Sequence, residues 1–281
     1  MREISNYFNE KIRGCIQSLC HKNSITEIRM RIGKPLIINF INNEVVLEHV
    51  IVTEGDIKDT FNIATEYSAY AYEDNIKNGF LSVPGGHRIG FGGVAVTDNG
   101  SITGLKNIMF LNIRVCHQIE NCSFDVYKKI HLNERLRHTL IISPPGLGKT
   151  TLLRDLIKNI SNNKRGTSIC VIDERNEIAG TFRGIPTIDL GKRTDIISNC
   201  NKKDGILMAV RAMGPQVIAV DEIGGTEDMT ALRYASVSGV VVIATLHGES
   251  VEDAKNKMGQ DLLTFFKNIV VIKEKGEYIC Y

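Results

Sequence analysis

The chain is short of several features that define other protein classes. Its 281 residues include no tryptophan, its 7 cysteines contain no C-x-x-C pair, and its formal net charge is +2. Cysteines without a regular spacing favour free thiols in a reducing compartment over a disulfide framework or a zinc site. A near-neutral chain also has no broad basic field that would attract nucleic acid.

Long apolar segments are missing as well. No stretch approaches the ~20 apolar residues of a membrane-spanning helix, and the first residues, MREISNYFNEKIRG, are too polar for a secretory signal. A hydrophobic content of 43% with 23% charged residues is ordinary for a globular protein, and the length allows two modest domains. We therefore expect a cytoplasmic protein that does not cross a membrane on its own, which leaves peripheral attachment open.

The most informative segment spans residues 138–153 and reads HTLIISPPGLGKTTLL: an apolar strand, a Gly/Pro loop and the start of a helix. Because Gly146 and Gly148 carry no side chains, consecutive backbone N–H groups can surround a phosphate at the helix N-terminus. Lys149 would reach the β- and γ-phosphates, and the Thr150 hydroxyl would bind Mg²⁺. The predicted nucleotide-binding loop consists of Ser143, Pro144, Pro145, Gly146, Leu147, Gly148, Lys149, Thr150 and Thr151.

One position of this loop departs from the pattern G-x-x-x-x-G-K-[ST]. Ser143 stands where the pattern has its first glycine. Serine is small enough for the bend from strand to loop, so the departure weakens the match without removing it. The alternative interpretation is a glycine-rich turn that binds no ligand.

An acidic pair follows a second apolar strand. The segment QVIAVDE ends in Asp221 and Glu222, at the carboxyl end of a strand, where ligands bind in parallel sheets. Asp221 is placed to hold Mg²⁺ directly or through water, and Glu222 to orient or deprotonate the attacking water. Acidic pairs after apolar strands are common, but together with Lys149 this pair predicts nucleotide hydrolysis.

Two further strands end in polar groups. VIDERNEI carries Asp173 and Glu174, and VIATLHGE carries His247. If these strands adjoin the other two, all the groups lie along one edge of the sheet. Asp173 is then a candidate metal ligand, and Glu174 would assist through the metal shell. His247 would either sense the γ-phosphate by a hydrogen bond or bridge to a carboxylate and couple hydrolysis to movement. Taken singly, the acidic residues also fit a solvated turn, and the histidine fits a surface position.

The two halves of the chain differ in periodicity. The first half predicts a helix within residues 6–20, strands at 25–31 and 35–40, a helix from Glu54 to about Tyr70, and antiparallel hairpins over 80–115. The second half has apolar strands at 139–143, 168–172, 217–221 and 240–245, mostly separated by helix-length segments, and a final hairpin over 270–280. That pattern is typical of a parallel sheet covered on both faces.

These patterns predict an α/β fold with two domains. We expect a smaller α+β domain over residues 1–118, a linker over 119–137, and a P-loop domain with a mostly parallel sheet over 138–281.

The order of the motifs resembles the ATPases of type II and type IV secretion and pilus assembly. Several blocks resemble more closely the stage III sporulation AA proteins of endospore-forming Gram-positive bacteria. These blocks are EIRMRIGKPL (27–36), GFLSVPGGHRIGFGG (79–93), LNIRV (111–115), SPPGLGKTTLLRDL (143–156), DERNEIAG (173–180) and the run RTDII…AVRAMGPQVIAVDEIGG (193–225). The resemblance extends over nearly the whole chain.

The resemblance implies properties that the spacing alone does not. It implies a RecA-like ATPase core, ATP with Mg²⁺ as the bound nucleotide, and a homo-hexamer. It also implies a place on the mother-cell side of a channel to the forespore, attached to membrane channel components. In secretion ATPases, arginines of the N-terminal domain complete the nucleotide site, and Arg88 and Arg114 occupy the matching blocks. The alternative for each is an ordinary surface arginine.

We therefore expect a Mg²⁺-dependent ATPase that energises or gates a sporulation channel. Its expected catalytic residues are Lys149, Glu174, Glu222, His247, Arg88 and Arg114. One alternative is a nucleic-acid translocase of the RecA class, although the near-neutral charge and the lack of an aromatic and basic stripe count against a nucleic-acid partner. Another is a scaffold that assembles on ATP with negligible turnover.

Overall fold

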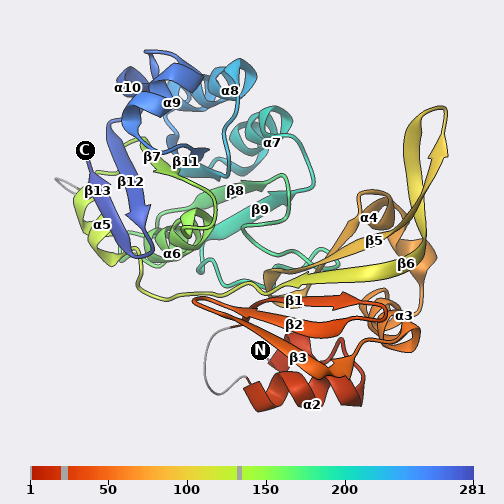
Figure 1. The fold of residues 1–281 in the computed structure, drawn as a ribbon. Coiled ribbons are helices and arrows are strands. Elements are labelled where there is room, and N and C mark those ends of the chain that lie inside the picture. The colour runs from red at the N-terminus through yellow and green to blue at the C-terminus, as the bar shows by residue number, and fades with distance from the viewer. Residues whose placement is uncertain (1, 20–24, 132–134) are drawn as a thin grey trace. The chain divides into compact units, whose positions relative to one another are not determined.

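The computed structural model describes residues 2–19, 25–131 and 135–281. The chain forms two compact units, each with its own sheet and core. The first comprises Met1–His117 with Gly180–Thr187, and the second comprises Gln118–Ala179 with Ile188–Tyr281. Figure 1 shows both sheets and the helices that belong to them.

The first unit is built on an antiparallel sheet of six strands in the order β3-β2-β1-β6-β5-β4. Its strands are β1 (Ile25–Arg31), β2 (Pro35–Phe40), β3 (Glu44–Ile51), β4 (Phe80–Val83), β5 (His87–Asp98) and β6 (Ser101–Arg114). Its α-helices are α1 (Arg2–Ser5), α2 (Glu10–Leu19), α3 (Glu54–Ala64) and α4 (Glu73–Lys77), and its 3₁₀ turns are η1 (Ala69–Tyr72) and η2 (Pro84–Gly86).

One face of this sheet forms the core of the first unit. Burial alternates along β1 and β2 as the period of a strand requires, so that Ile28, Met30 and Ile38 are buried. They share a cluster with Ile12 and Ile16, which lie on the buried stripe of α2. Strands β5 and β6 are longer than their neighbours, and in Figure 1 their hairpin extends beyond the other strands.

Helix α3 begins as predicted and ends early. Thr53 and Asp56 form a capping box, in which each side chain accepts a hydrogen bond from the other residue's backbone N–H. The predicted end near Tyr70 is wrong, because Glu66 and Tyr67 adopt left-handed backbone angles, with φ of 50° and 56°. The chain resumes as η1 and α4 instead.

The second unit is built on a sheet of seven strands in the order β13-β12-β7-β11-β10-β8-β9. All neighbouring pairs are parallel except the hairpin of β12 and β13. The strands are β7 (Thr139–Ser143), β8 (Ile169–Asp173), β9 (Thr194–Ser198), β10 (Val217–Val220), β11 (Val241–His247), β12 (Asn268–Glu274) and β13 (Glu277–Cys280). The helices are α5 (Phe124–Ile130), α6 (Lys149–Ser161), α7 (Lys202–Met208), the π-helix η4 (Ala209–Met213), α8 (Thr226–Val237), α9 (Val251–Met258) and α10 (Leu262–Phe265).

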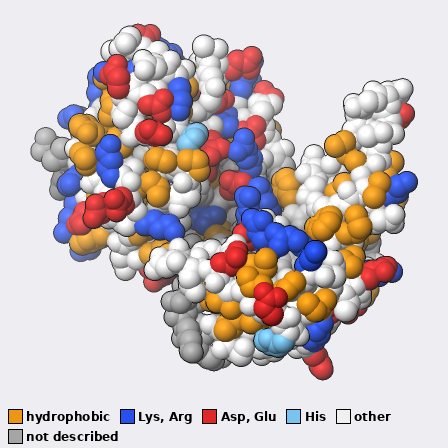
Figure 2. Space-filling view, viewed as in Figure 1, with side chains coloured by type: hydrophobic (Ala, Val, Ile, Leu, Met, Phe, Trp, Pro, Cys, Tyr) orange, Lys and Arg blue, Asp and Glu red, His pale blue; other side chains and the backbone are white. Residues whose placement is uncertain are grey.

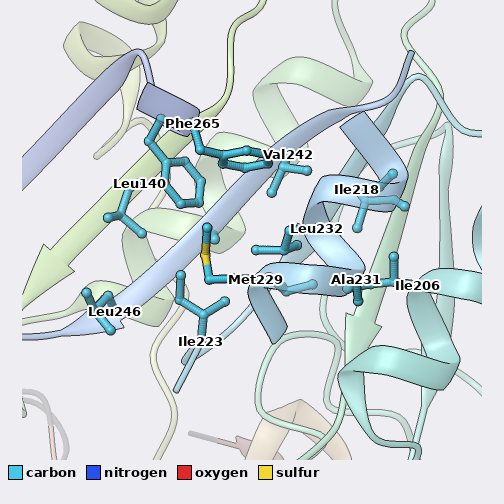
Figure 3. Close-up of a cluster of buried hydrophobic side chains, with 14 of the residues drawn as sticks. Leu140, Ile206, Ile218, Ile223, Met229, Ala231, Leu232, Val242, Leu246 and Phe265 are labelled. Carbon is cyan, nitrogen blue, oxygen red and sulfur yellow. The ribbon is translucent and has the colours of Figure 1, made fainter. Parts of the chain in front are cut away.

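Both faces of this sheet are covered, as the apolar strands predict. Every residue of β7, β8 and β10 is buried. One face packs against α7, α8, α9 and α10, and Figure 3 shows Ile206, Met229, Leu232 and Phe265 of that layer against Leu140, Ile218 and Val242 of the strands. Helix α6 contacts β7, β9 and β11 and contributes its own buried leucines and isoleucines.

Two features of the chain differ from the expected domain limits. The predicted linker, 119–137, contains α5, whose Val126 and Ile130 are buried within the second unit. The segment Gly180–Thr187, expected in the P-loop domain, clusters with the first unit. Thr187 there accepts a hydrogen bond at Oγ1 from the Gly85 N–H (2.9 Å), which ties this excursion of the chain to η2. Because these two residues are far apart in the sequence, no local sequence pattern could predict that this segment belongs to the first unit.

The surface and helix lengths add two observations. Within the described residues, no helix combines the length and hydropathy needed to span a membrane. On the face of the second unit shown in Figure 2, acidic and basic side chains are interspersed, so neither sign forms a continuous field there.

The capping box of α3 predicts a pH-dependent contribution to stability. Burial pushes the pKa of Asp56 upward, but hydrogen bonds from Thr53, Asn9 and Lys11 outweigh it, so the pKa lies below its usual value. The stabilisation is therefore complete above the unfolded pKa of about 3.9 and is lost as the pH falls through the lower folded pKa. We expect Asp56→Ala to lower the free energy of unfolding by about 1–3 kcal/mol at pH 7.

Urea unfolding followed by circular dichroism measures this effect. The matched control is Asp59→Ala, since Asp59 is an exposed carboxylate on the same helix. Equal losses for the two variants at pH 7 would contradict the assignment of the stabilisation to the cap.

Candidate functional site

The predicted site residues of the second unit lie along one edge of its sheet. Strands β7, β11, β10 and β8 are consecutive neighbours and run parallel. Their carboxyl ends therefore meet at one edge, which receives the loop after β7 and the polar residues that end the other three strands. The expectation that four adjacent strands present these groups together is confirmed.

The loop between β7 and α6 has the backbone that its glycines suggest. Gly146 and Gly148 have φ of 77° and 95°, in the left-handed region that favours glycine. Ser143 is the last residue of β7, and its Oγ donates to the Pro144 carbonyl oxygen (2.8 Å). The position thus has strand geometry, which any small residue can adopt, and this explains why glycine is not required there.

Two polar contacts connect this loop to the acidic pair. Lys149 Nζ lies 3.1 Å from Glu222 Oε1, and Thr150 Oγ1 donates to Asp221 Oδ2 at 2.9 Å. Lys149 is buried and Glu222 is half-buried. The acidic pair and the loop, 71 residues apart from Thr150 to Asp221, therefore form one cluster.

The backbone at Glu222 is held in an uncommon conformation. Its φ is 48°, and its N–H donates both to Asp221 Oδ1 (3.0 Å) and to Thr245 Oγ1 (2.8 Å). The Thr245 hydroxyl in turn donates to Asp221 Oδ1. A left-handed glutamate costs free energy, so these bonds from a neighbouring strand are needed to fix it. They direct the side chain toward Lys149.

Charge sets the ionisation of Glu222. Its partial burial pushes the pKa upward, but the hydrogen bond and charge of Lys149, with the charges of Arg175 and His247, outweigh burial. The pKa therefore lies below its usual value, and the carboxylate is ionised near neutral pH.

The structure gives Asp173 a different environment from that of a metal ligand. Its buried carboxylate accepts hydrogen bonds from the backbone N–H groups of Glu177, Ile178 and Ala179, at 2.8 to 3.1 Å. Burial raises the pKa of Asp173 despite these bonds. Both oxygens are thus engaged in shaping the loop after β8, which does not fit the expected role in metal binding.

The side chains next to Asp173 also have partners. Glu174 forms an ion pair with the largely buried Lys202 at the start of α7. Arg175 NH1 lies 2.5 Å from Glu222 Oε2. The acidic loop therefore pairs Glu174 with α7 and brings the Arg175 guanidinium to Glu222.

His247 ends β11 directly beside the P-loop. It pairs in register with Ser143, and its Nδ1 lies 3.2 Å from the Ser143 carbonyl oxygen. A carbonyl only accepts, so this contact places a proton on Nδ1 and leaves Nε2 as the second polar atom of an exposed ring.

Arg88 and Arg114 belong to the first unit, whereas the P-loop belongs to the second. They are directly opposite each other on β5 and β6. Opposed residues on neighbouring strands share a face of the sheet, and Glu27 of β1 lies directly opposite Arg114 on its other side. Arg88 also stacks over the Phe80 ring at 4.0 Å.

Three contributors to the site are missing from the sequence-based prediction. Thr245 binds both residues of the acidic pair, Arg175 contacts Glu222, and Arg154 of α6 donates to the carbonyls of Glu177 and Ile178. A polar residue inside the apolar run of β11 was the available signal for Thr245. An arginine on the buried side of the P-loop helix was the signal for Arg154.

The donor set fits a magnesium nucleotide. Among the described residues, no group of three or more His, Cys, Asp and Glu could hold a metal ion alone. Mg²⁺ in nucleotide sites usually takes one or two protein ligands, with phosphates and waters completing its shell. Thr150 and Asp221 supply such a pair, and left-handed glycines precede a helix N-terminus for the phosphates.

Proteins of known family and structure are similar to this chain. Residues 1–279 match the family model described as "Sporulation stage III, protein AA". The chain is also 37% identical over 258 residues to stage III sporulation protein AA of Bacillus subtilis (strain 168), which covers 90% of this chain and 83% of the relative.

Among solved structures, the ATPase DotB of Legionella pneumophila has a TM-score of 0.63 and 15% identity, and covers 96% of this chain and 78% of that one. The pilus retraction motor PilT, solved with bound ADP, has a TM-score of 0.63 and 18% identity. The match covers 92% of this chain and 76% of PilT. At these identities the likeness shows the fold, which is that of the RecA-like secretion ATPases and confirms the expected fold class.

The contacts of Asp173 predict a structural role. We expect Asp173→Ala to lower the free energy of unfolding by about 2–3 kcal/mol, because buried backbone N–H groups lose their acceptor. The control is Asp195→Ala, an exposed carboxylate on the neighbouring strand β9. Urea unfolding without nucleotide or magnesium tests this, and an undiminished stability would restore the metal-ligand interpretation.

Proposed function

The chain belongs to the sporulation stage III protein AA family, and from that premise we propose that it is a Mg²⁺-dependent ATP hydrolase that energises or gates a sporulation channel. The observation that carries the proposal is the cluster of Lys149 and Thr150 with Asp221 and Glu222. A glycine-rich turn without a ligand has no need of a buried lysine directed at a carboxylate from a distant strand.

Each residue of the cluster has a proposed role. The backbone N–H groups of the loop and Lys149 bind the phosphates, and this requires Lys149 to give up part of its contact with Glu222. Glu222 then polarises the attacking water, for which its ionised state is suited. His247, with a second ring nitrogen available beside the loop, responds to the γ-phosphate.

Thr150 and Asp221 would hold Mg²⁺, which when bound neutralises phosphate charge. Thr245 holds the Asp221 carboxylate and the Glu222 backbone in place through its two hydrogen bonds. Glu174 assists at the outer edge of the site, where its ion pair with Lys202 fixes its position. Asp173 is given no catalytic part.

Arg88 and Arg114 are proposed to complete the site with positive charge. They lie directly opposite each other on β5 and β6, which places both on one face of that sheet. An added cation on the transferring phosphoryl group is worth ~10³-fold or more in rate. Support from the relatives is that DotB is an ATPase and that PilT is a motor solved with ADP.

The proposal extends to assembly and place. We propose a homo-hexamer in the mother-cell cytoplasm that attaches to membrane channel components and so associates with the membrane peripherally. The alternatives make different demands on the same site. A nucleic-acid translocase would hydrolyse ATP faster with DNA present, and a nucleotide-gated scaffold would assemble on ATP without turnover.

Substitution of Glu222 tests the hydrolysis. We expect Glu222→Gln to lower the rate of phosphate release from Mg-ATP by ~10²–10⁴-fold, because an amide cannot accept the proton of water. The matched control is Glu227→Gln, an exposed glutamate at the start of α8. Light scattering on the same samples follows assembly with and without Mg-ATP.

The combined measurements separate the candidates. Turnover that depends on Glu222, together with a ring that forms on Mg-ATP, is expected. Assembly on ATP with equal, negligible phosphate release from the wild type and Glu222→Gln would favour the scaffold instead.

Substitution of Thr150 tests the magnesium site. Thr150→Ala removes a hydroxyl ligand and should raise the Mg²⁺ concentration for half-maximal turnover by about tenfold or more. The control Thr230→Ala removes an exposed hydroxyl from α8. An unchanged magnesium requirement in Thr150→Ala would count against the assigned metal ligands.

A further inference from the structure

Glu222 has two cationic partners, one on each carboxylate oxygen. Lys149 Nζ lies 3.1 Å from Oε1, and Arg175 NH1 lies 2.5 Å from Oε2. The lysine comes from the P-loop helix α6, and the arginine from the loop that follows β8. The carboxylate is thus held between two elements of the second unit, α6 and the loop after β8.

The two contacts are not equivalent once nucleotide is bound. Lys149 is the residue that the phosphates take as a partner, so its attraction for Glu222 is divided or lost at that moment. Arg175 lies on a different element and is not required by the phosphate loop. It is therefore the cation that can keep Glu222 in place while Lys149 binds the nucleotide.

The loop that carries Arg175 is fixed from both sides of its backbone. Its N–H groups at Glu177, Ile178 and Ala179 donate to Asp173. Its carbonyl groups at Glu177 and Ile178 accept from the buried Arg154 of α6. These bonds fix the backbone of the loop that carries Arg175, although the Arg175 side chain itself is 62% exposed.

We propose that Arg175 is the positioning residue that aims Glu222 at the attacking water during hydrolysis. This inference rests on the proposed ATPase function and adds to it a residue that acts through Glu222. The guanidinium contact at 2.5 Å fixes one oxygen of the carboxylate, which leaves Oε1 for the attacking water when Lys149 turns to the phosphates.

The first test is the steady-state hydrolysis of Mg-ATP by Arg175→Ala, Arg175→Lys and a matched control. The control is Arg233→Ala, because Arg233 is a half-exposed arginine of the same unit that pairs with Asp261 at 3.1 Å. We expect Arg175→Ala to lower kcat by about tenfold or more, since misplacement of a catalytic group by about 1 Å costs up to ~10²-fold. KM should change by less than about threefold, and Arg175→Lys should recover part of the loss by restoring the charge.

The second test reads the contact without turnover. The affinity for Mg-ADP is measured by calorimetry for wild type, Arg175→Ala, Glu222→Gln and the double variant. Without Arg175, Glu222 relies more on its ion pair with Lys149 and so competes with the phosphates for that lysine, and Arg175→Ala should weaken binding by about threefold in the presence of Glu222. In the Glu222→Gln background the same substitution should have no effect.

The outcomes distinguish a failure of the positioning role of Arg175 from a failure of the proposed ATPase function. A kcat for Arg175→Ala within twofold of wild type, or an equal loss in Arg233→Ala, would overturn the positioning role alone. An equal effect of Arg175→Ala on Mg-ADP affinity with and without Glu222 would do so as well. A wild type no faster than Glu222→Gln overturns the proposed hydrolysis instead, and the affinity measurements then still decide whether Arg175 acts on Glu222.

Discussion

Charge compensation at the edge of a buried sheet is the constraint on which the second unit depends. Four neighbouring parallel strands end together; β8 ends in the carboxylate of Asp173, and β10 is followed directly by that of Asp221. Placed at the margin of a dry core, such groups are costly unless they are paired. Each is paired here: Asp173 by backbone N–H groups, Glu174 by Lys202, Asp221 by hydroxyls, and Glu222 by Lys149 and Arg175. The arrangement that keeps the fold stable also brings together the residues of the proposed nucleotide site.

How far the sequence predicts this site depends on the kind of pattern that each residue leaves. Lys149 and Glu222 follow from a loop signature and from the end of an apolar run, because buried parallel strands have a recognisable composition and converge at one edge. The role of Asp173 cannot be predicted from the sequence. An acidic residue at a strand end has the same sequence pattern whether its oxygens bind a metal or accept hydrogen bonds from backbone N–H groups, as they do here. Arg175 and Thr245 act through partners far along the chain, and such contacts leave no local periodicity.

The fold shows the same division. The strands of the parallel sheet and the capping box at Thr53 were predictable, because periodicity and caps are local. Strand β9 and the early end of α3 were not. Strand β9 is short and lies at the edge of the sheet beside β8, so its burial is incomplete and its apolar signal weak. The end of α3 depends on left-handed angles at Glu66 and Tyr67, residues without a strong turn preference.

The path of the chain after β8 links the chemistry to the first unit. The acidic loop carries Glu174 and Arg175, is fixed by Asp173 and Arg154, and ends at Ala179; the next residue, Gly180, already belongs to the first unit. A change in Glu222 that pulled on Arg175 would therefore act on a segment that is covalently continuous with Gly180–Thr187. Since that segment is bonded to η2 through Thr187 and Gly85, the displacement has a path of covalent and hydrogen bonds into the unit that carries Arg88. If the proposed hydrolysis drives movement, this route is the one by which a change at Glu222 would reach the first unit.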